Sequence, residues 1–509
     1  MLNKIKLVGI STVLTFIISF FIFSGRDNNS NKSYMGYKND VFWKGTSKHA
    51  HHILNRALSF ETHFGWATGN HTASPVVCGA VGPEKYTNKL EGIIQNTDIA
   101  KVCKEAVADG INVMLVIGDG MGINQMSLPI YMNIAEGSDN ITNFERILNE
   151  GSCGISLTNP IEGLVTGSAS AGTALASGTK TYTHALGVDT TGKPLESTLE
   201  MAEKRGVATG LITDTGITDA TPAAFYAHSV NRNLENNVAA QLIENNTIEV
   251  IFGGGAKRFL PQGEYLKDYF SYNESIGFEN STSSRDDNKN LFKVFQSKDY
   301  EIICNREELL NLDGNTERVL GLFSSSGLSA YIDRDNEITS QPNLVEMTSK
   351  GLEILNNNKN YFVMIEAGRI DWEAHDNDAG SVYKAVEEMD EVLSVCYDQY
   401  KANKNKTLLI FTADHETGGF SISYTKLPKG QYHTKELKNG EIWKNRTDPL
   451  LFEKFLLLKE QKSSIYTLFE KSKKPQYIYN KINNNIGYKI TKEDAEVINN
   501  VINDYKKGK

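Results

Sequence analysis

The sequence predicts an α/β protein in which a large, mostly parallel sheet carries helices on both faces, between a helical N-terminal preface and a helical C-terminal segment. From Asn112 onward, short apolar, β-branched runs alternate with stretches of helical pattern. This alternation is typical of parallel strands joined by helices. Several runs end directly in Asp, Glu or Gly. Since open α/β sheets bind ligands beyond the carboxyl ends of their strands, we expect the chemistry there.

Six segments have the length and composition of buried strands. They are residues 112–118 (NVMLVIG), 207–213 (VATGLIT), 249–254 (EVIFGG), 318–323 (RVLGLF), 361–367 (YFVMIEA) and 407–413 (TLLIFTA). The polar, Asn-rich stretch 271–290 predicts an inserted surface loop.

The chain of 509 residues is long enough for one large domain with insertions or for two domains. We expect a preface of helices and loops at residues 34–110, a catalytic domain at 111–423 and a Lys- and Asn-rich helical segment at 424–509. The chain stops at INDYKKGK, just after a helical insert, which is compatible with a truncated C-terminal part.

Residues 1–33 have the pattern of an export signal. Lys4 and Lys6 precede an uncharged apolar stretch, Leu7 to Phe23, and polar Asn-rich residues follow it. The stretch is slightly long for a signal-peptide core and short for a spanning helix, so a cleaved signal peptide and a membrane anchor are both open. We therefore expect an exported protein that is periplasmic, secreted or held at the outer face of the cytoplasmic membrane.

Charge and cysteine content exclude several function classes. A formal net charge of -9 without a long basic run argues against nucleic acid as a partner. The five cysteines form no CxxC pair, which argues against a thiolate metal cluster or a redox motif. One or two disulfides are possible in an exported chain, with Cys78 and Cys103 the closest pair; the alternative is five small buried apolar residues.

Two acid-histidine pairs in the second half of the chain have the composition of a zinc site. Asp371 and His375 are four residues apart, so on a helix they point the same way. Asp414 and His415 directly follow the apolar run 407–413. Carboxylate oxygens and imidazole nitrogens suit zinc. Either pair alone is commonly structural, and it is their occurrence together with the motifs upstream that favours a metal site.

Two motifs upstream extend the constellation. Asp119 lies between glycines in VIGDGMG at the end of the first predicted strand, where its carboxylate could bridge two cations. Ser168 opens the small-residue run SASAGTALASG. A helix that begins there would offer backbone donors and a positive dipole to an anion, and a nearby zinc ion would activate the hydroxyl.

The segment TDATPAAFYAHSVNR adds oxygen ligands and a cation. Asp219 and Thr221 offer two oxygens of the kind that magnesium prefers, and Glu366 could add a third. Arg232 provides the planar fork that binds two oxygens of a phosphate.

With these motifs in order, the chain resembles the alkaline phosphatase family. VIGDGMG, the small-residue run after Ser168, TDATPAA, EAGRIDWEAH and TADHETGG follow one another between residues 113 and 420. The resemblance implies an alkaline phosphatase-like fold, phosphate monoester hydrolysis on small substrates, two zinc ions and one magnesium ion, and a possible homodimer.

The resemblance also implies a role for each residue. Ser168 would be the nucleophile that becomes phosphorylated, and Arg232 would hold the phosphate oxygens. One zinc ion would be held by Asp119, Asp414 and His415, and the other by Asp371 and His375. The magnesium ligands would be Asp119, Thr221 and Glu366, with Asp219 beside them directly or through water.

The chain departs from the family pattern in three places. Gly167 stands where an Asp is common, and Trp372 stands where some members have Lys or His. The third departure concerns the second zinc ion, which in the family takes another His from a Gly/Thr-rich motif near the carboxyl end, followed by a strand and a Tyr-Gly-Pro turn. His433 is the only His after His415; it or water would have to complete this site.

Two other functions stay open at this point. The same metal site suits a phosphodiesterase or a sulfatase-like hydrolase, although Arg232 and the magnesium ligands favour monoesters. The absent third ligand suits a degenerate protein that binds metal or phosphate without full activity.

Overall fold

The computed structural model describes residues 63–244, 247–269, 278, 281–336, 340–427, 429–448, 450–470, 475–486, 492 and 495–496, all within one compact unit, Val41–Lys509. The predicted export signal, residues 1–33, lies outside the described residues. In the part that is described, no helix has the length and apolar character needed to cross a bilayer.

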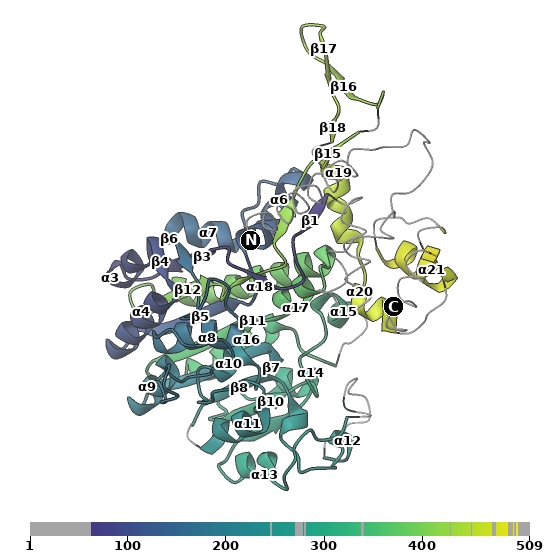
Figure 1. The fold of residues 1–509 in the computed structure, drawn as a ribbon. Coiled ribbons are helices and arrows are strands. Elements are labelled where there is room, and N and C mark those ends of the chain that lie inside the picture. The colour runs from purple at the N-terminus through teal and green to yellow at the C-terminus, as the bar shows by residue number, and fades with distance from the viewer. Residues whose placement is uncertain are drawn as a thin grey trace, which may run out of the picture. The chain divides into compact units, whose positions relative to one another are not determined.

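Ten strands form one central sheet (Figure 1), which confirms the predicted fold class. All six predicted strands are present. The pairs from β12 to β9 are parallel, whereas β3 is antiparallel to both of its neighbours. In sheet order the strands are β4 (Gly92–Gln95), β6 (Ser152–Leu157), β3 (Val76–Val81), β12 (Thr407–Thr412), β5 (Asn112–Gly118), β11 (Tyr361–Ala367), β7 (Ala208–Gly216), β8 (Val250–Gly254), β10 (Val319–Leu322) and β9 (Glu301–Ile303).

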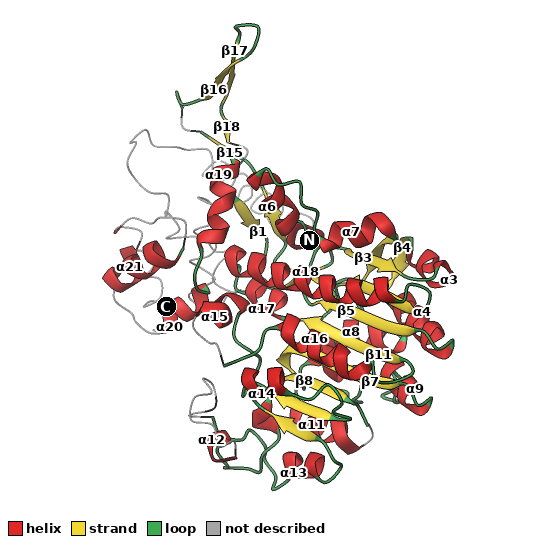
Figure 2. Ribbon diagram, turned by 180° about the vertical axis from the view of Figure 1, so that it is seen from behind, coloured by secondary structure: helices red, strands yellow, loops and turns green. Residues whose placement is uncertain are grey.

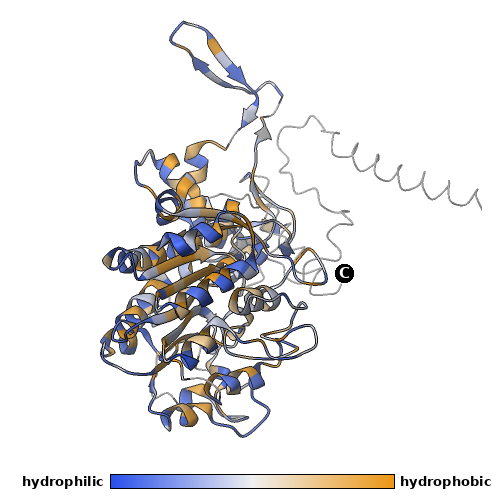
Figure 3. Cartoon of the chain, turned by 90° about the vertical axis from the view of Figure 1, so that its left-hand side faces the viewer, coloured by the Kyte–Doolittle hydropathy of each residue, from blue (hydrophilic) through white to orange (hydrophobic). Residues whose placement is uncertain are grey.

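Helices cover both faces of this sheet, as Figures 1 and 2 show from opposite sides. Because side chains alternate along a strand, Val113, Leu115 and Ile117 of β5 enter one buried cluster, while Met114 and Val116 enter the other. Apolar residues accordingly concentrate on the strands and the inner sides of helices in Figure 3. The first cluster includes α4 (Asn96–Ala108), α8 (Ser168–Ser177), α9 (Thr198–Lys204), α10 (Ala220–Ala223), α11 (Glu235–Glu244) and α13 (Leu291–Gln296). The second includes α5 (Ile123–Met126), α6 (Leu128–Glu136), α7 (Asn143–Glu150), α14 (Arg306–Asn311), α16 (Leu344–Leu355), α17 (Arg369–His375) and α18 (Ala379–Ala402).

The N-terminal preface is not simply helical. Besides α4, α3 (Glu84–Thr87) and the 3-10 helix η2 (Asn88–Leu90), it contains β1 (Phe64–Trp66), β2 (His71–Thr72), β3 and β4. Every residue of β3 is buried, because it lies inside the sheet between β6 and β12. Residues expected to precede the catalytic domain therefore supply part of its sheet.

The C-terminal segment also differs from the helical prediction, which is wrong for residues 425–448. These residues form β15 (Thr425–Lys426), β16 (His433–Glu436), β17 (Ile442–Asn445) and β18 (Thr447–Asp448). A turn at Asn439-Gly440, in which Gly440 has a φ of 82°, separates β16 from β17; Asn-Gly is a strong hairpin signal. Helices follow as predicted: α19 (Phe452–Phe455), the 3-10 helix η4 (Leu456–Glu460), α20 (Ile465–Glu470) and α21 (Pro475–Asn485).

Two further sequence predictions concern a loop and the cysteines. In the predicted loop 271–290, the described residues, 278 and 281–290, contain no helix or strand. Four of the five cysteines are buried and none forms a disulfide in the described part of the chain.

The remaining elements are short. They are the 3-10 helix η3 (Ala256–Arg258), α12 (Leu266–Tyr269), α15 (Tyr331–Asn336), β13 (Glu416–Thr417), which pairs with β2, and β14 (Phe420–Ile422), which pairs with β1.

Candidate active site

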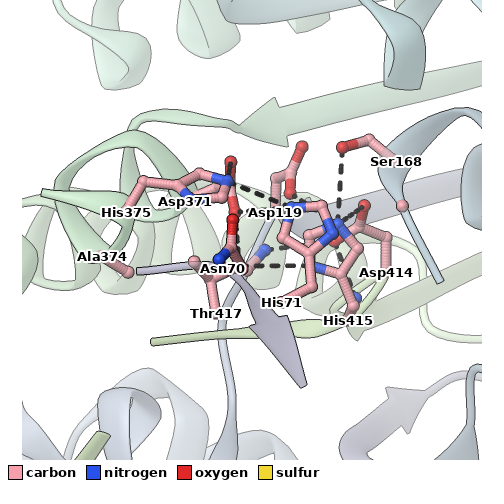
Figure 4. Close-up of polar contacts among 12 residues, drawn as sticks. Asn70, His71, Asp119, Ser168, Asp371, Ala374, His375, Asp414, His415 and Thr417 are labelled. Carbon is pink, nitrogen blue, oxygen red and sulfur yellow. Dashed lines mark hydrogen bonds and ion pairs between the residues drawn. The ribbon is translucent and has the colours of Figure 1, made fainter. Parts of the chain in front are cut away.

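The predicted site residues gather at one edge of the sheet, beyond the carboxyl ends of four neighbouring parallel strands. Asp119 follows β5, Asp414 follows β12, Glu366 lies near the end of β11 and Asp219 follows β7. Helix α17, which begins directly after β11, presents Asp371 to the same place (Figure 4). Parallel strands end together, so acids from distant parts of the sequence meet here.

Asp119, Asp414 and His415 form a first group of potential metal ligands, all buried. His415 Nε2 lies 3.2 Å from Asp414 Oδ2 and 3.6 Å from Asp119 Oδ1. The backbone N–H of Gly120 donates to Asp414 Oδ1 at 3.1 Å. Gly120 has a φ of 73°, and a Cβ there would lie 2.8 Å from the Cα of Asp371, so only glycine permits this approach.

Ser168 is the first residue of α8 and lies beside this first group. Its Oγ is 3.4 Å from His415 Nε2, and its backbone belongs to the helix N-terminus, which favours anions. The small residues of α8 allow close packing against α10: a Cβ on Gly172 would lie 3.1 Å from Ala224 Cβ and 3.3 Å from Thr221 Cα. The packing that the small-residue run predicts thus fixes the hydroxyl at the strand ends.

Asp371, His375 and His71 form a second group. Nε2 of His375 lies 3.3 Å from Asp371 Oδ2 and 3.1 Å from Nε2 of His71, which is itself 3.7 Å from Asp371 Oδ1. The Nδ1 atoms face backbone carbonyls, that of Gly69 for His375 (2.7 Å) and that of Thr166 for His71 (2.9 Å). Carbonyls accept hydrogen bonds from Nδ1–H, which leaves the Nε2 lone pairs directed at the group.

The sequence prediction does not include His71, because the family pattern places the third histidine near the carboxyl end. Most of the features expected there occur instead near the amino end: GNHT at residues 69–72, the strand β3 and then Gly82-Pro83, with Val81 in place of the expected Tyr. The pattern is therefore present, displaced to the opposite end of the chain order. His433 lies on β16, which pairs with β17, and belongs to neither of the two groups.

The short strand pair β2–β13 places His71 in the site. His71 is in register with Thr417, two residues after His415, and the imidazoles of His71 and His415 stack with centroids 3.7 Å apart. The Thr417 hydroxyl donates to Asp371 and lies 3.3 Å from His415 Nδ1. This one residue therefore contacts both groups.

The residues expected to bind magnesium adjoin the first group. Thr221 Oγ1 lies 3.3 Å from Asp119 Oδ2. Glu366 accepts hydrogen bonds from the hydroxyls of Thr213 and Thr215, two residues of β7 that the sequence did not single out. Asp219 contacts the guanidinium of Arg232, so it orients the arginine.

Burial of several acids together raises their pKa values. Desolvation, with the charges of Asp414 and Asp371, raises the pKa of Asp119. Desolvation likewise raises the pKa of Asp414 to about 7 and that of Glu366 to about 8. Burial makes these carboxylates difficult to ionise when no cation is near. A bound cation would stabilise their ionised forms, so the site favours cation binding.

The imidazoles of the second group have the opposite effect on Asp371. Burial alone would raise its pKa, but the charges of His375 and His71 lower it below the ordinary value. Burial would lower the pKa of His375, whereas Asp371 raises it to about 9. Burial lowers the pKa of His71, which favours the neutral ring that binds metals.

The chemistry of these donors fits metal ions. Asp119 Oδ1 and Asp414 Oδ2 are buried and accept no hydrogen bond within the described residues, and unsatisfied buried carboxylate oxygens are rare unless they bind ions or water. Each group combines carboxylate oxygens with imidazole nitrogen, the donor set of zinc. The residues beside Asp119 add hydroxyl and carboxylate oxygens, which suit magnesium.

A cavity of about 520 Å³ is lined by Ser168, Arg232, Asp119 of the first group and all three residues of the second group. Arg232 is half-buried, and its backbone N–H donates to the carbonyl of His184 at 2.9 Å. Trp372, which follows Asp371, forms part of the wall. The cavity therefore combines a serine hydroxyl, an arginine cation and potential metal ligands from both groups.

Comparison with known proteins gives consistent matches. The profile of the alkaline phosphatase family matches residues 111–506. Alkaline phosphatase 4 of Bacillus subtilis is 34% identical over 342 residues, 65% of this chain and 66% of that protein. The alkaline phosphatase of Schizosaccharomyces pombe is 33% identical over 324 residues, 61% of this chain and 56% of that protein. The matched region thus spans 66% and 56% of these two relatives, less than two thirds of each.

Solved structures give the same result for the fold. The crystal structure of Thermus thermophilus alkaline phosphatase superposes with a TM-score of 0.60 at 26% identity, covering 77% of this chain and 76% of that one. The alkaline phosphatase of the Antarctic bacterium TAB5 superposes with a TM-score of 0.51 at 25% identity, covering 66% and 87%. His71 precedes the first residue matched by the family profile.

Proposed function

Because the chain belongs to the alkaline phosphatase family, we propose that it hydrolyses phosphate monoesters at the carboxyl ends of β5, β7, β11 and β12. The observation that carries this proposal is one cavity lined by Ser168, Arg232, the three residues of the second ligand group and Asp119 of the first, with Asp414 and His415 buried beside Asp119. A monoester dianion offers several free oxygens, and the cavity offers donors and cation sites on several sides.

Ser168 is the nucleophile in this proposal. Its Oγ forms a bond to phosphorus as the bond from phosphorus to the ester oxygen breaks, and the alcohol leaves with a proton. Water then attacks the phosphoserine, which releases phosphate and restores the hydroxyl. The N-terminus of α8 and the fork of Arg232 stabilise the non-bridging oxygens in both steps, and Asp219 holds Arg232 in place.

The two groups would each hold one zinc ion, and the oxygens beside Asp119 would hold magnesium. The first zinc ligands are Asp119, Asp414 and His415, the second are Asp371, His375 and His71, and the magnesium ligands are Asp119, Thr221 and Glu366, with Asp219 alongside. Bound zinc supplies Lewis acidity, which stabilises negative charge on oxygen and lowers the pKa of water. Thr213 and Thr215 orient Glu366, and Thr417 orients Asp371.

His71 also bears on the alternative of a degenerate binding protein. That alternative was motivated by an incomplete second group, and His71 supplies the third side chain. The diesterase and sulfatase alternatives are tested by comparing hydrolysis rates on a phosphate monoester, a phosphate diester and a sulfate ester. We expect the monoester to be the best substrate.

The test of the proposed function is phosphate release from a simple aryl phosphate at alkaline pH, with zinc and magnesium supplied. Wild-type protein should turn over, while Ser168→Ala should lose nearly all activity and keep its metal content. Turnover no higher than that of Ser168→Ala would contradict the proposal. Loss of activity with retained zinc separates the role of the hydroxyl from damage to the site.

We further propose that residues 1–33 direct export, which places the enzyme outside the cytoplasmic membrane. Fractionation of cells that express the full chain, compared with a chain lacking residues 1–33, tests this. Retention of the full chain in the cytoplasm would contradict it. A homodimer, which the family resemblance implies, is tested by light scattering.

A further inference from the structure

A second compartment of about 240 Å³ lies beside the cavity that contains Ser168. Asp219, Arg232 and Trp372 line both spaces, so a molecule held by Arg232 can reach from one into the other. The rest of this wall includes Lys257 and Ser326, which belong to neither group of potential metal ligands.

The far wall is built from the 3-10 helix η3, with Gly255 before it, and from the loop after β10, and these two segments are bonded to each other along their backbones. Gly255 N–H donates to the carbonyl of Ser326 at 2.7 Å, Ala256 N–H to that of Ser324 at 3.1 Å and Lys257 N–H to that of Ser325 at 3.2 Å. This ladder fixes the backbone that carries the Lys257 side chain. The wall is therefore formed before any ligand enters.

Trp372 forms the boundary between the two spaces. The guanidinium of Arg369 lies over its ring, 4.8 Å from the centroid, and a Cβ on Gly327 would lie 2.6 Å from Cη2 of the indole. The ring is thus held between Arg369 and a glycine that leaves room for it. Trp372 lines both spaces, and its aromatic carbon atoms suit the carbon skeleton of an alcohol rather than its charged end.

Among the charged side chains described in the wall of the smaller compartment, Lys257 has no carboxylate partner. Asp219 contacts Arg232, and Glu235 is bound by Arg258 at 2.7 Å. Lys257 is half-buried; its Nζ lies 3.3 Å from the Oγ of Ser326, and no carboxylate lies within ion-pair distance of it in the described part of the chain. An ammonium group in this setting favours an anion.

We propose that this compartment binds the alcohol part of the substrate and selects monoesters whose alcohol carries a second anionic group, a carboxylate or another phosphate. The inference rests on the proposed function and adds to it a preference among substrates. The ester phosphate lies on Arg232 beside Ser168, the carbon skeleton passes Trp372, and the second anion meets Lys257 and Ser326.

The test compares two substrates with the same three-carbon skeleton, glycerol 3-phosphate and 3-phosphoglycerate, which differ in the carboxylate at the far end. Wild-type enzyme should show kcat/KM higher for 3-phosphoglycerate by about 3- to 10-fold, the range of a partly exposed charge-assisted contact. The ratio should fall with added salt, because exposed charges are screened. Lys257→Met should bring the ratio close to one, and Lys257→Arg should retain a preference.

Lys406→Met is the matched control, since Lys406 is exposed and directly precedes β12, at the amino end of that strand and so away from the carboxyl ends where the cavity lies; it should leave both rates unchanged. Equal kcat/KM for the two substrates in wild type, or an unchanged ratio in Lys257→Met, would overturn the inference while leaving the hydrolase itself intact. Absence of turnover on both substrates and on an aryl phosphate would instead overturn the proposed function.

Discussion

The Nε2 atoms of His71 and His375 lie 3.1 Å apart although 304 positions separate the two residues. Both Nδ1 atoms face backbone carbonyls, so both Nε2 lone pairs are free to converge on a cation beside Asp371. This contact turns an acid-histidine pair on one helix into a three-ligand group. The candidate second zinc site therefore depends on a segment near the amino end of the chain.

His71→Ala should remove one zinc ion per chain at free zinc concentrations where the wild type holds two. Loss of a residue that hydrogen-bonds to a metal ligand lowers metal affinity or activity roughly 10- to 100-fold. Loss of a direct ligand should lower metal affinity by at least as much. The measurement is zinc content by mass spectrometry together with kcat on an aryl phosphate. His433→Ala is the control and should retain two zinc ions; equal zinc loss in the two variants would contradict the assignment.

Thr417→Val should weaken metal binding without unfolding the protein. The change is nearly isosteric, but it removes the hydroxyl that donates to Asp371 and lies near His415. Loss of such an orienting bond costs about 10- to 100-fold in metal affinity. Competition with a chelator measures the affinity, and Thr417→Ser, which keeps the hydroxyl, should restore most of it. A valine variant with wild-type affinity would show that the hydroxyl has no orienting role.

His184→Gly should stabilise the protein. His184 has a φ of 69°, a left-handed conformation that is unfavourable for a residue with a Cβ, so we expect a gain of about 0.5–1 kcal/mol in the free energy of unfolding. Urea denaturation at fixed metal concentration is the measurement, because bound metal also shifts apparent stability. His184→Ala keeps the Cβ and should give no gain. Equal effects of the two variants would rule out backbone strain as the cause.

The contribution of His228 to stability should fall as pH rises. The hydrogen bond to Glu200, at 2.8 Å, raises the pKa of His228 above its ordinary value of 6.5. A group whose pKa is raised by folding contributes its full stabilisation at pH values below its unfolded pKa. This stabilisation is lost as the pH rises through the folded pKa. We therefore expect the wild type to exceed His228→Gln in stability by more at pH 6 than at pH 9.

Urea denaturation across this pH range measures the difference, and Glu200 stays ionised throughout because its own pKa is lowered. A difference between wild type and variant that is constant or grows with pH would contradict the assignment. The bond between His228 and Glu200 also bears on the site. The next residue, Ser229, is hydrogen-bonded to the backbone of Leu186, and these contacts fix the position of the segment between His228 and Arg232.

The sequence alone determined the features that arise from local spacing and from strand periodicity. Apolar runs such as residues 112–118 and 361–367 were predicted with the observed bounds, because a buried strand must be apolar on both faces. Asp371 and His375 meet because α17 brings residues four apart onto one side. Parallel strands ending at one edge then brought Asp119 and Asp414 together.

Other features depended on pairing between distant segments, which local pattern does not encode. His71 is brought to the site by the pairing of the two-residue strand β2 with β13. A strand of this length is too short to give a periodic sequence pattern, and its place in chain order was not expected. Thr213 and Thr215 support Glu366 only because β7 and β11 are neighbours. The tertiary structure also decided that Lys257 and Trp372 line one compartment, since η3, which follows β8, and α17, which follows β11, meet only once the sheet has formed.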